Sequence, residues 1–201
     1  MARPGVAIID SGGANIASLL YAFERLRTAA VLTTDAATIR GAERVVLPGV
    51  GAARAAMNRL EERQLVDVIR GLTQPVLGIC LGMQLLAEAS EEEDVECLGI
   101  IPGTAARLPA SPICPVPNMG WCRIEPRVAD PLLAGIDGGA YFYFLHSYAL
   151  PVSEYTIASA EHAGPFAAAV RRNNFFAAQF HPERSSSAGA RLLQNFLDLP
   201  E

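Results

Sequence analysis

The chain has 201 residues, 51% of them hydrophobic and 18% charged, which suffices for one sizeable buried core and predicts a single domain over residues 1–201. Its net charge of −5 and pI of about 5.3 argue against a nucleic-acid partner, and the absence of lysine among the 16 basic residues excludes Schiff-base chemistry. No apolar run is long enough to span a bilayer, and no secretory signal precedes the first strand pattern, so the sequence predicts a cytoplasmic protein without membrane contact.

The first half of the chain alternates strand and helix patterns. Helical spacing of apolar residues begins at Ile16 and recurs in two later segments. Because strands that alternate with helices are joined by crossover connections, this half predicts a mostly parallel central sheet flanked by helices, the α/β class. The expected strands are 5–9, 29–33, 44–47 and 75–79, and the later helices are 52–69 and 81–89.

The second half has a different pattern. Four prolines lie in 108–117 and predict an irregular connection. Runs rich in aromatic and β-branched residues follow and predict added antiparallel strands, with 172–174 as a hairpin turn and a closing helix over 185–197. The expected strands are 141–145, 155–158, 166–170 and 175–180.

One cysteine lies in a motif that suits a nucleophile. The segment 78–82 reads Gly-Ile-Cys-Leu-Gly between a predicted buried strand and a predicted helix. This is the pattern of a nucleophile elbow with Cys80 in place of serine, and a helix start favours a thiolate. None of the four cysteines falls in a C-x-x-C pair, so zinc binding is disfavoured and all four are expected as free thiols.

A nucleophilic cysteine needs a base, and three histidines are present. His181 follows a predicted strand and precedes Pro182, which places it at a strand end, where ligand sites of open α/β sheets gather. If the chain stays extended there, Glu183 lies on the same side and can orient the imidazole as the third member of a triad. His162 suits a surface loop, whereas His146 is equally compatible with the core and with a site.

Acyl transfer also needs donors for an oxyanion. The N–H of Leu81, directly after the nucleophile, is one candidate. The segment 48–51, Pro-Gly-Val-Gly, can turn the backbone N–H of Val50 or Gly51 toward the site. Taken alone, the same segment is better explained as a plain turn.

Together these motifs resemble the class I (triad) glutamine amidotransferases. The matching segments are 78–84, Gly-Ile-Cys-Leu-Gly-Met-Gln, and 179–183, Gln-Phe-His-Pro-Glu. The resemblance implies that Cys80 attacks the side-chain amide of glutamine, that His181 transfers the proton to departing ammonia, and that water hydrolyses the thioester. It implies no metal and no cofactor.

Within that class, the chain resembles the glutaminase subunits of imidazole glycerol phosphate synthases over essentially its whole length. The resemblance implies docking on a (β/α)8-barrel cyclase, which receives ammonia and forms imidazole glycerol phosphate and an aminoimidazole carboxamide ribotide in histidine biosynthesis. The segments that carry this resemblance are 9–15, 48–51, 97–103, 116–121 and 141–148.

The same resemblance implies roles for further residues. The glutamine should be surrounded by Gly51, Gln84, Ser147 and Tyr148. The residues expected toward the partner are Asn15, Asn118, Met119, Trp121, Tyr143 and Arg184. The chain departs from the family pattern at four positions. Ala14 stands where the family usually has glycine, Asn118 where it has histidine, Cys122 where it has asparagine, and Arg184 where it has lysine. All four departures fall in the docking region that the resemblance implies and leave the triad intact.

Three alternatives remain open. The first is a glutaminase serving another synthase, of the pyridoxal phosphate or anthranilate type, which the segments 119–121 and 146–148 disfavour. The second is a non-catalytic interaction module on the same fold, which the intact Cys80, His181 and Glu183 disfavour. The third is a cysteine hydrolase of γ-glutamyl bonds, which would normally be secreted.

Overall fold

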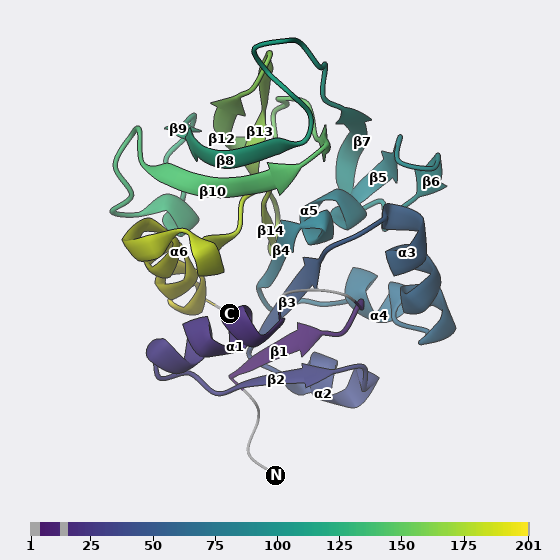
Figure 1. Cartoon of the computed structure of the whole chain (residues 1–201). Helices are drawn as coiled ribbons and strands as arrows, with labels where there is room; N and C mark the ends of the chain where they lie inside the picture. Colours follow the sequence, from purple (N-terminus) through teal and green to yellow (C-terminus); the bar gives the residue numbers. More distant parts are fainter. Residues whose placement is uncertain (1–4, 13–15, 201) are drawn as a thin grey trace.

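The centre of the structure is an eight-stranded sheet (Figure 1). A computed structural model describes residues 5–12 and 16–200. Five neighbouring strands, from one edge inward, pair in parallel. The fifth of them also pairs on its other side with the first of three antiparallel strands, which complete the sheet, as the sequence predicts. From one edge to the other the strands are β2 (Ala30–Thr33), β1 (Val6–Ile9), β3 (Arg44–Gly49), β4 (Val76–Cys80), β14 (Phe175–Ala178), β13 (Pro165–Arg172), β12 (Thr156–Glu161) and β9 (Glu125–Pro126).

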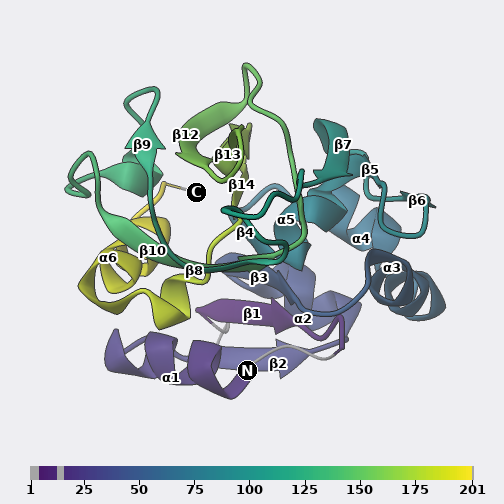
Figure 2. The same cartoon turned by 45° about the horizontal axis from the view of Figure 1, so that its top comes forward.

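Helices cover both faces of this sheet (Figures 1 and 2). On one face lie α1 (Ile16–Arg25) and α6 (Ser186–Leu197), and on the other lie α2 (Ala36–Gly41), α3 (Ala53–Glu62), α4 (Val66–Arg70) and α5 (Leu81–Leu86). The single helix expected over 52–69 is wrong, because Gln64 adopts a positive φ of 56° and separates α3 from α4. Within the described residues, no helix is both long enough and apolar enough to cross a membrane.

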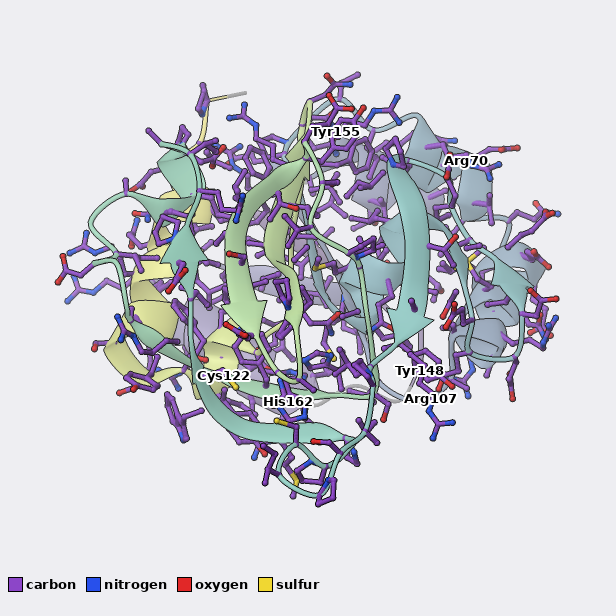
Figure 3. The ribbon with its side chains drawn as sticks, turned by 90° about the horizontal axis from the view of Figure 1, so that it is seen from above. Arg70, Arg107, Cys122, Tyr148, Tyr155 and His162 are labelled. Carbon is purple, nitrogen blue, oxygen red and sulfur yellow. The ribbon has the colours of Figure 1, made fainter. Side chains whose placement is uncertain are left out.

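Two smaller sheets lie outside the central one. The antiparallel pair β8 (Asn118–Arg123) and β10 (Tyr141–His146), called the ribbon below, crosses in front of β3 and β4 (Figure 2). The other sheet has the order β11 (Tyr148–Ala149), β7 (Ile101–Arg107), β5 (Ala87–Ser90) and β6 (Val95–Glu96). Tyr148 pairs with Arg107 there, and Figure 3 shows them side by side. Two short 3-10 helices, η1 (Pro131–Leu133) and η2 (Pro182–Arg184), complete the described elements.

The strand β5 corrects the helix expected over 81–89. The helix α5 ends at Leu86, and the carbonyls of its last turn accept hydrogen bonds from a segment further along the chain. The N–H of Leu98 donates to Leu85 and that of Ile100 to Leu86. These tertiary bonds replace the intrahelical ones that would have continued the helix.

The core lies on both faces of the sheet because successive strand side chains point in opposite directions. Leu77 and Ile79 of β4 pack in the core beneath α1 and α6, whereas Val76 packs in the core beneath α3 and α5. Cys80 breaks the alternation, since it joins the same core as Ile79. The chain therefore turns sharply at Cys80.

Candidate active site

The turn at Cys80 is a strained elbow between β4 and α5. Cys80 has φ 54° and ψ −110°, a region that residues with side chains rarely adopt. The flanking glycines make this turn possible. A Cβ on Gly82 would overlap the carbonyl oxygen of Leu47, and one on Gly78 would lie 2.8 Å from Leu86 Cδ1 and 2.9 Å from the Gly82 oxygen. Close packing of β3, β4 and α5 thus requires glycine at both positions and holds the sulfur in one place.

The predicted base and its orienting carboxylate are in contact. Nδ1 of His181 donates to Glu183 Oε1 over 2.9 Å, and both side chains are more than 90% buried. The expectation of an extended chain is wrong, because residues 182–184 form η2. The contact forms nevertheless, since the one-turn helix brings the two side chains together. The ribbon holds this turn, since the N–H of His181 donates to the carbonyl of Tyr143 over 2.9 Å.

The electrostatics of His181 favour its charged form. Burial alone lowers the pKa of His181. Hydrogen bonds with the Cys80 and Glu183 side chains, and the charges of both groups, outweigh burial and raise that pKa above its usual value. An imidazolium beside a cysteine sulfur is the arrangement that activates cysteine nucleophiles.

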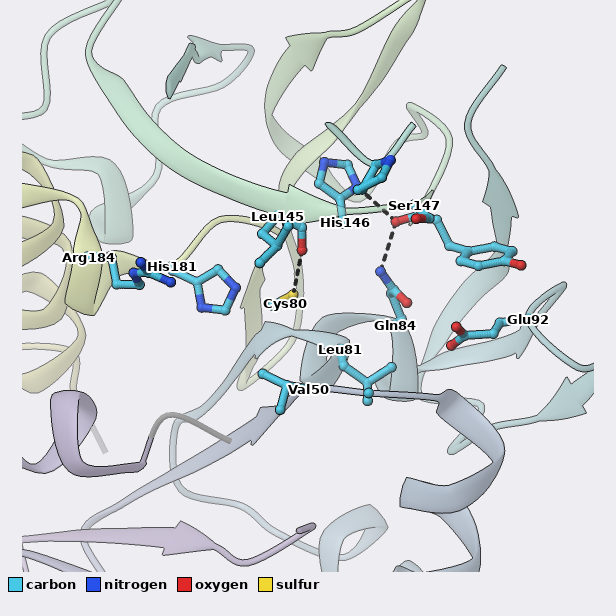
Figure 4. Close-up of a pocket in the computed structure, with 13 residues that line it drawn as sticks. Val50, Cys80, Leu81, Gln84, Glu92, Leu145, His146, Ser147, His181 and Arg184 are labelled. Carbon is cyan, nitrogen blue, oxygen red and sulfur yellow. Dashed lines mark hydrogen bonds between the residues drawn. The ribbon is translucent and has the colours of Figure 1, made fainter. Parts of the chain in front are cut away.

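The elbow opens into a cavity of about 350 Å³ (Figure 4). Cys80 lies between His181 on one side and Gln84 on the other. The thiol of Cys80 donates to the carbonyl of Leu145 on the ribbon over 3.6 Å. The cavity is lined by Val50, Gly51, Cys80, Leu81, Gln84, Glu92, Pro117, Leu145, His146, Ser147, Tyr148, His181 and Arg184. It therefore brings together every residue predicted for catalysis, the oxyanion and glutamine except Glu183, which lies behind His181.

The expected oxyanion segment follows the end of β3. Gly49, its last residue, pairs with Cys80, so the chain leaves the sheet beside the sulfur. Gly51 has a φ of 92°, a conformation that suits glycine and strains other residues. This geometry keeps Val50, Gly51 and Leu81 as the proposed sources of oxyanion donors.

The carbonyl of Tyr148 organises the far side of the cavity. It accepts from Gln84 Nε2 over 2.8 Å and lies 2.9 Å from Nδ1 of His146 (Figure 4). Because a carbonyl only accepts, His146 must carry its hydrogen on Nδ1. Burial, the largest cause, lowers the pKa of His146 to about 4, so the ring is neutral near pH 7. His146 both lines the cavity and packs against Phe166 in the core. The core role and the site role that its sequence position left open therefore both apply.

Two buried or cavity-lining polar residues were not predicted as site residues. Glu92 Oε2 accepts from the N–H of Ala53 at the start of α3 over 2.9 Å and lines the cavity. Gln179 has no exposed surface and contacts both Gln84 and Cys80. Gln179 begins the motif 179–183, so its place beside His181 in the sequence could have indicated a site residue. Glu92 lies in a run of acidic residues, and nothing in the sequence distinguishes it from its neighbours.

The residues predicted to face a partner divide into two groups. Met119 and Trp121 are 68% and 52% exposed on the ribbon. Arg184 stacks over the Tyr143 ring, 4.5 Å from its centroid. Asn118 differs, because the strand alternation turns it inward, where it is buried and its Nδ2 lies 3.0 Å from His146 Nε2. The expected partner residue Asn15, like the departure at Ala14, lies outside the described residues.

The fold and this site define a class of enzyme. The sequence model of the family "Glutamine amidotransferase class-I" matches residues 7–199. Two solved structures share the fold, and both are described as glutamine amidotransferases. One has a TM-score of 0.74 and 19% identity, and the match covers 96% of this chain and 97% of that one. The other, from Thermotoga maritima, has a TM-score of 0.68 and 17% identity, and the match covers 98% of this chain and 84% of that one.

Curated relatives narrow the assignment within that class. The imidazole glycerol phosphate synthase subunit HisH of Idiomarina loihiensis is 53% identical over 96% of this chain and 97% of its own. Those of Vibrio cholerae and Xylella fastidiosa are 48% and 50% identical over 96% of this chain, and over 98% and 97% of their own. The chain therefore belongs to the class I glutamine amidotransferases and, within them, to the family of imidazole glycerol phosphate synthase subunits HisH.

Proposed function

We propose that the protein is the glutaminase subunit of imidazole glycerol phosphate synthase in histidine biosynthesis. It hydrolyses glutamine to glutamate and ammonia. The ammonia passes to a (β/α)8-barrel cyclase subunit, which forms imidazole glycerol phosphate and an aminoimidazole carboxamide ribotide. As an enzyme of amino-acid biosynthesis it acts in the cytoplasm. The observation that carries the proposal is the elbow that sets Cys80 beside the paired His181 and Glu183, in a chain of this family.

The cavity suits glutamine at both ends. Glu92 is the only acidic side chain among the described residues that line it, and its carboxylate can receive the α-ammonium group of the substrate. The side-chain amide then lies at Cys80, where the N–H groups of Leu81 and of Val50 or Gly51 stabilise the oxyanion. Gln84, Ser147 and Tyr148 line the cavity between these ends.

Catalysis proceeds through a thioester. The thiolate of Cys80 attacks the amide carbon, and the oxyanion forms between the backbone donors. The imidazolium of His181 gives its proton to the departing nitrogen, so the carbon–nitrogen bond breaks and ammonia leaves. The neutral His181 next takes a proton from water, the hydroxide attacks the thioester, and glutamate is released from the regenerated thiolate and imidazolium. Glu183 keeps Nδ1 protonated, so Nε2 performs both proton transfers.

Replacing the nucleophile tests this division of labour. Cys80→Ala in the complex with the cyclase should abolish glutamine-dependent synthesis while synthesis from added ammonium continues. Cys97→Ala is a matched control, because Cys97 is also a buried free thiol but does not line the cavity. Loss of both activities in Cys80→Ala would contradict the proposal. Co-purification of the chain with a barrel cyclase, rather than with a pyridoxal phosphate or anthranilate synthase, tests the choice of partner.

A further inference from the structure

A second amide lies behind the nucleophile. Gln179 connects β14 with η2, and its side chain is fully buried. Its Oε1 accepts from Gln84 Nε2 over 3.1 Å, and its Nε2 lies 3.8 Å from Cys80 Sγ. The mechanism above assigns no role to this residue, although it contacts the reacting sulfur directly.

The direction of these hydrogen bonds is fixed from one end. The Tyr148 carbonyl can only accept, so Gln84 must present its NH2 group there. That same NH2 group faces Gln179, which must therefore present its oxygen to Gln84. The NH2 group of Gln179 is left to face Cys80. Turning Gln84 over would set its oxygen against the Tyr148 carbonyl, and turning Gln179 over would set two NH2 groups against each other in a buried site. The structure thus keeps an N–H donor aimed at the sulfur.

A thiolate needs such a donor more than a thiol does. The thiol of Cys80 can donate to the carbonyl of Leu145, but a thiolate only accepts, and beside that carbonyl it is destabilised. In the cycle above, the sulfur is a thiolate while His181 is charged and a thioester once the proton of His181 has gone to ammonia. The amide of Gln179 stays uncharged and keeps its hydrogens through the whole cycle. It therefore gives the thiolate a second donor beside the imidazolium.

We propose that Gln179 is a further catalytic residue, which stabilises the thiolate of Cys80 through an N–H donor whose orientation is set by Gln84 and the Tyr148 carbonyl. This inference rests on the proposed function, because it deepens the account of the same nucleophile. It also gives Gln84 two tasks, one toward the substrate cavity and one toward the sulfur. A glutamine substrate that contacts Gln84 is thereby connected to Cys80 through the hydrogen bond between Gln84 and Gln179.

Two substitutions separate the donor from the rest of the side chain. Gln179→Glu keeps an oxygen for Gln84 and removes the donor to the sulfur. Gln179→Met has a similar length and removes both polar groups. In the assembled complex, alkylation of Cys80 by iodoacetamide, read by mass spectrometry of the Cys80 peptide, reports the thiolate fraction as a function of pH. The peptide readout is needed because Cys97, Cys114 and Cys122 are also free.

The midpoint of the alkylation profile should rise by about one pH unit in Gln179→Met and by more in Gln179→Glu, whose carboxylate also repels a thiolate. On the rising part of the profile, alkylation of Gln179→Met then slows about tenfold and kcat falls with it. KM for glutamine should rise in Gln179→Met, which removes one of the two acceptors of Gln84, and change less in Gln179→Glu. If burial of a carboxylate prevents Gln179→Glu from folding, Gln179→Met alone decides. A folded Gln179→Met complex with an unchanged midpoint, even if its melting temperature falls, would overturn the proposal.

The failure of this inference is distinguishable from failure of the proposed function. An unchanged midpoint removes only the role of Gln179. If instead the wild-type complex still hydrolysed glutamine after complete alkylation of Cys80, the nucleophile itself would be wrong.

Discussion

The elbow (residues 78–82) and the ribbon of β8 and β10 meet at the same sulfur but are built differently. Every residue of β4 and α5 is buried, and the elbow is fixed by contacts between backbones. The ribbon alternates instead, with Phe142 and Phe144 inside and Met119 and Trp121 outside. The comparison shows that the position of the nucleophile is determined by packing density, whereas the ribbon holds the site with one face and exposes the other face to solvent.

The largest effect is expected where the elbow is most crowded. In Gly82→Ala the new methyl group overlaps the Leu47 carbonyl, which is backbone and cannot yield. We expect the free energy of unfolding in urea to fall by about 4 kcal/mol or more, or the chain not to fold. Gly41→Ala is the control, because a Cβ there meets nothing within 4 Å. A loss below about 1 kcal/mol in Gly82→Ala would show that packing does not fix the elbow.

The next largest effect is expected at η2, the turn that carries Glu183 and that the ribbon holds through the N–H of His181. In Glu183→Gln an amide replaces the carboxylate that accepts from His181 Nδ1, so the imidazolium loses its stabilising charge and the tautomer is no longer fixed. We expect glutamine-dependent kcat to fall about a thousandfold, while synthesis from ammonium is retained. Glu161→Gln, at an exposed position on β12, is the control. A fall of less than about tenfold would show that Glu183 does not orient the base.

The contrast also explains what the sequence could predict. The elbow is a local motif, so Cys80 and its glycines were found from adjacent residues. The ribbon depends on pairing between residues far apart, such as Trp121 with Tyr143, and the segment 118–123 contains no β-branched residue that would indicate a strand.

Distant contacts explain the other differences. The segment 87–90, Ala-Glu-Ala-Ser, contains good helix formers, but pairing with β7 makes it a strand. Glu92 joins the cavity through the N–H of Ala53, 39 residues away in the sequence. The sequence predicts that His181 meets Glu183 across an extended chain, but a 3-10 turn brings the two side chains together.

The inner face of the ribbon makes the protein sensitive to acid. The pKa of His146 falls from 6.5 to about 4 on folding, chiefly through burial. Between these values the unfolded chain binds more protons than the folded one, so stability is lost as pH falls through this window, by about 3 kcal/mol from this group. Urea unfolding at pH 7 and pH 4 should show a smaller loss in His146→Gln than in wild type. His162→Gln, outside the ribbon, should keep the full loss, and equal losses in all three proteins would contradict the assignment.

The outer face of the ribbon provides the smallest expected effect. Trp121 is 52% exposed and touches Tyr143 edge-on, with ring centroids 6.2 Å apart. If this face binds the cyclase, Trp121→Ala should weaken the complex by about 2 kcal/mol, roughly thirtyfold, in titration calorimetry. Tyr21→Ala is a matched aromatic control, since Tyr21 is 60% exposed on α1, away from the ribbon. Because the Trp121 ring lies outside the core, the free energy of unfolding of the isolated chain should change by less than about 0.5 kcal/mol. Equal affinities for the two variants would place the partner elsewhere, and a large loss of stability in Trp121→Ala would show that both faces of the ribbon, like the elbow, serve the fold.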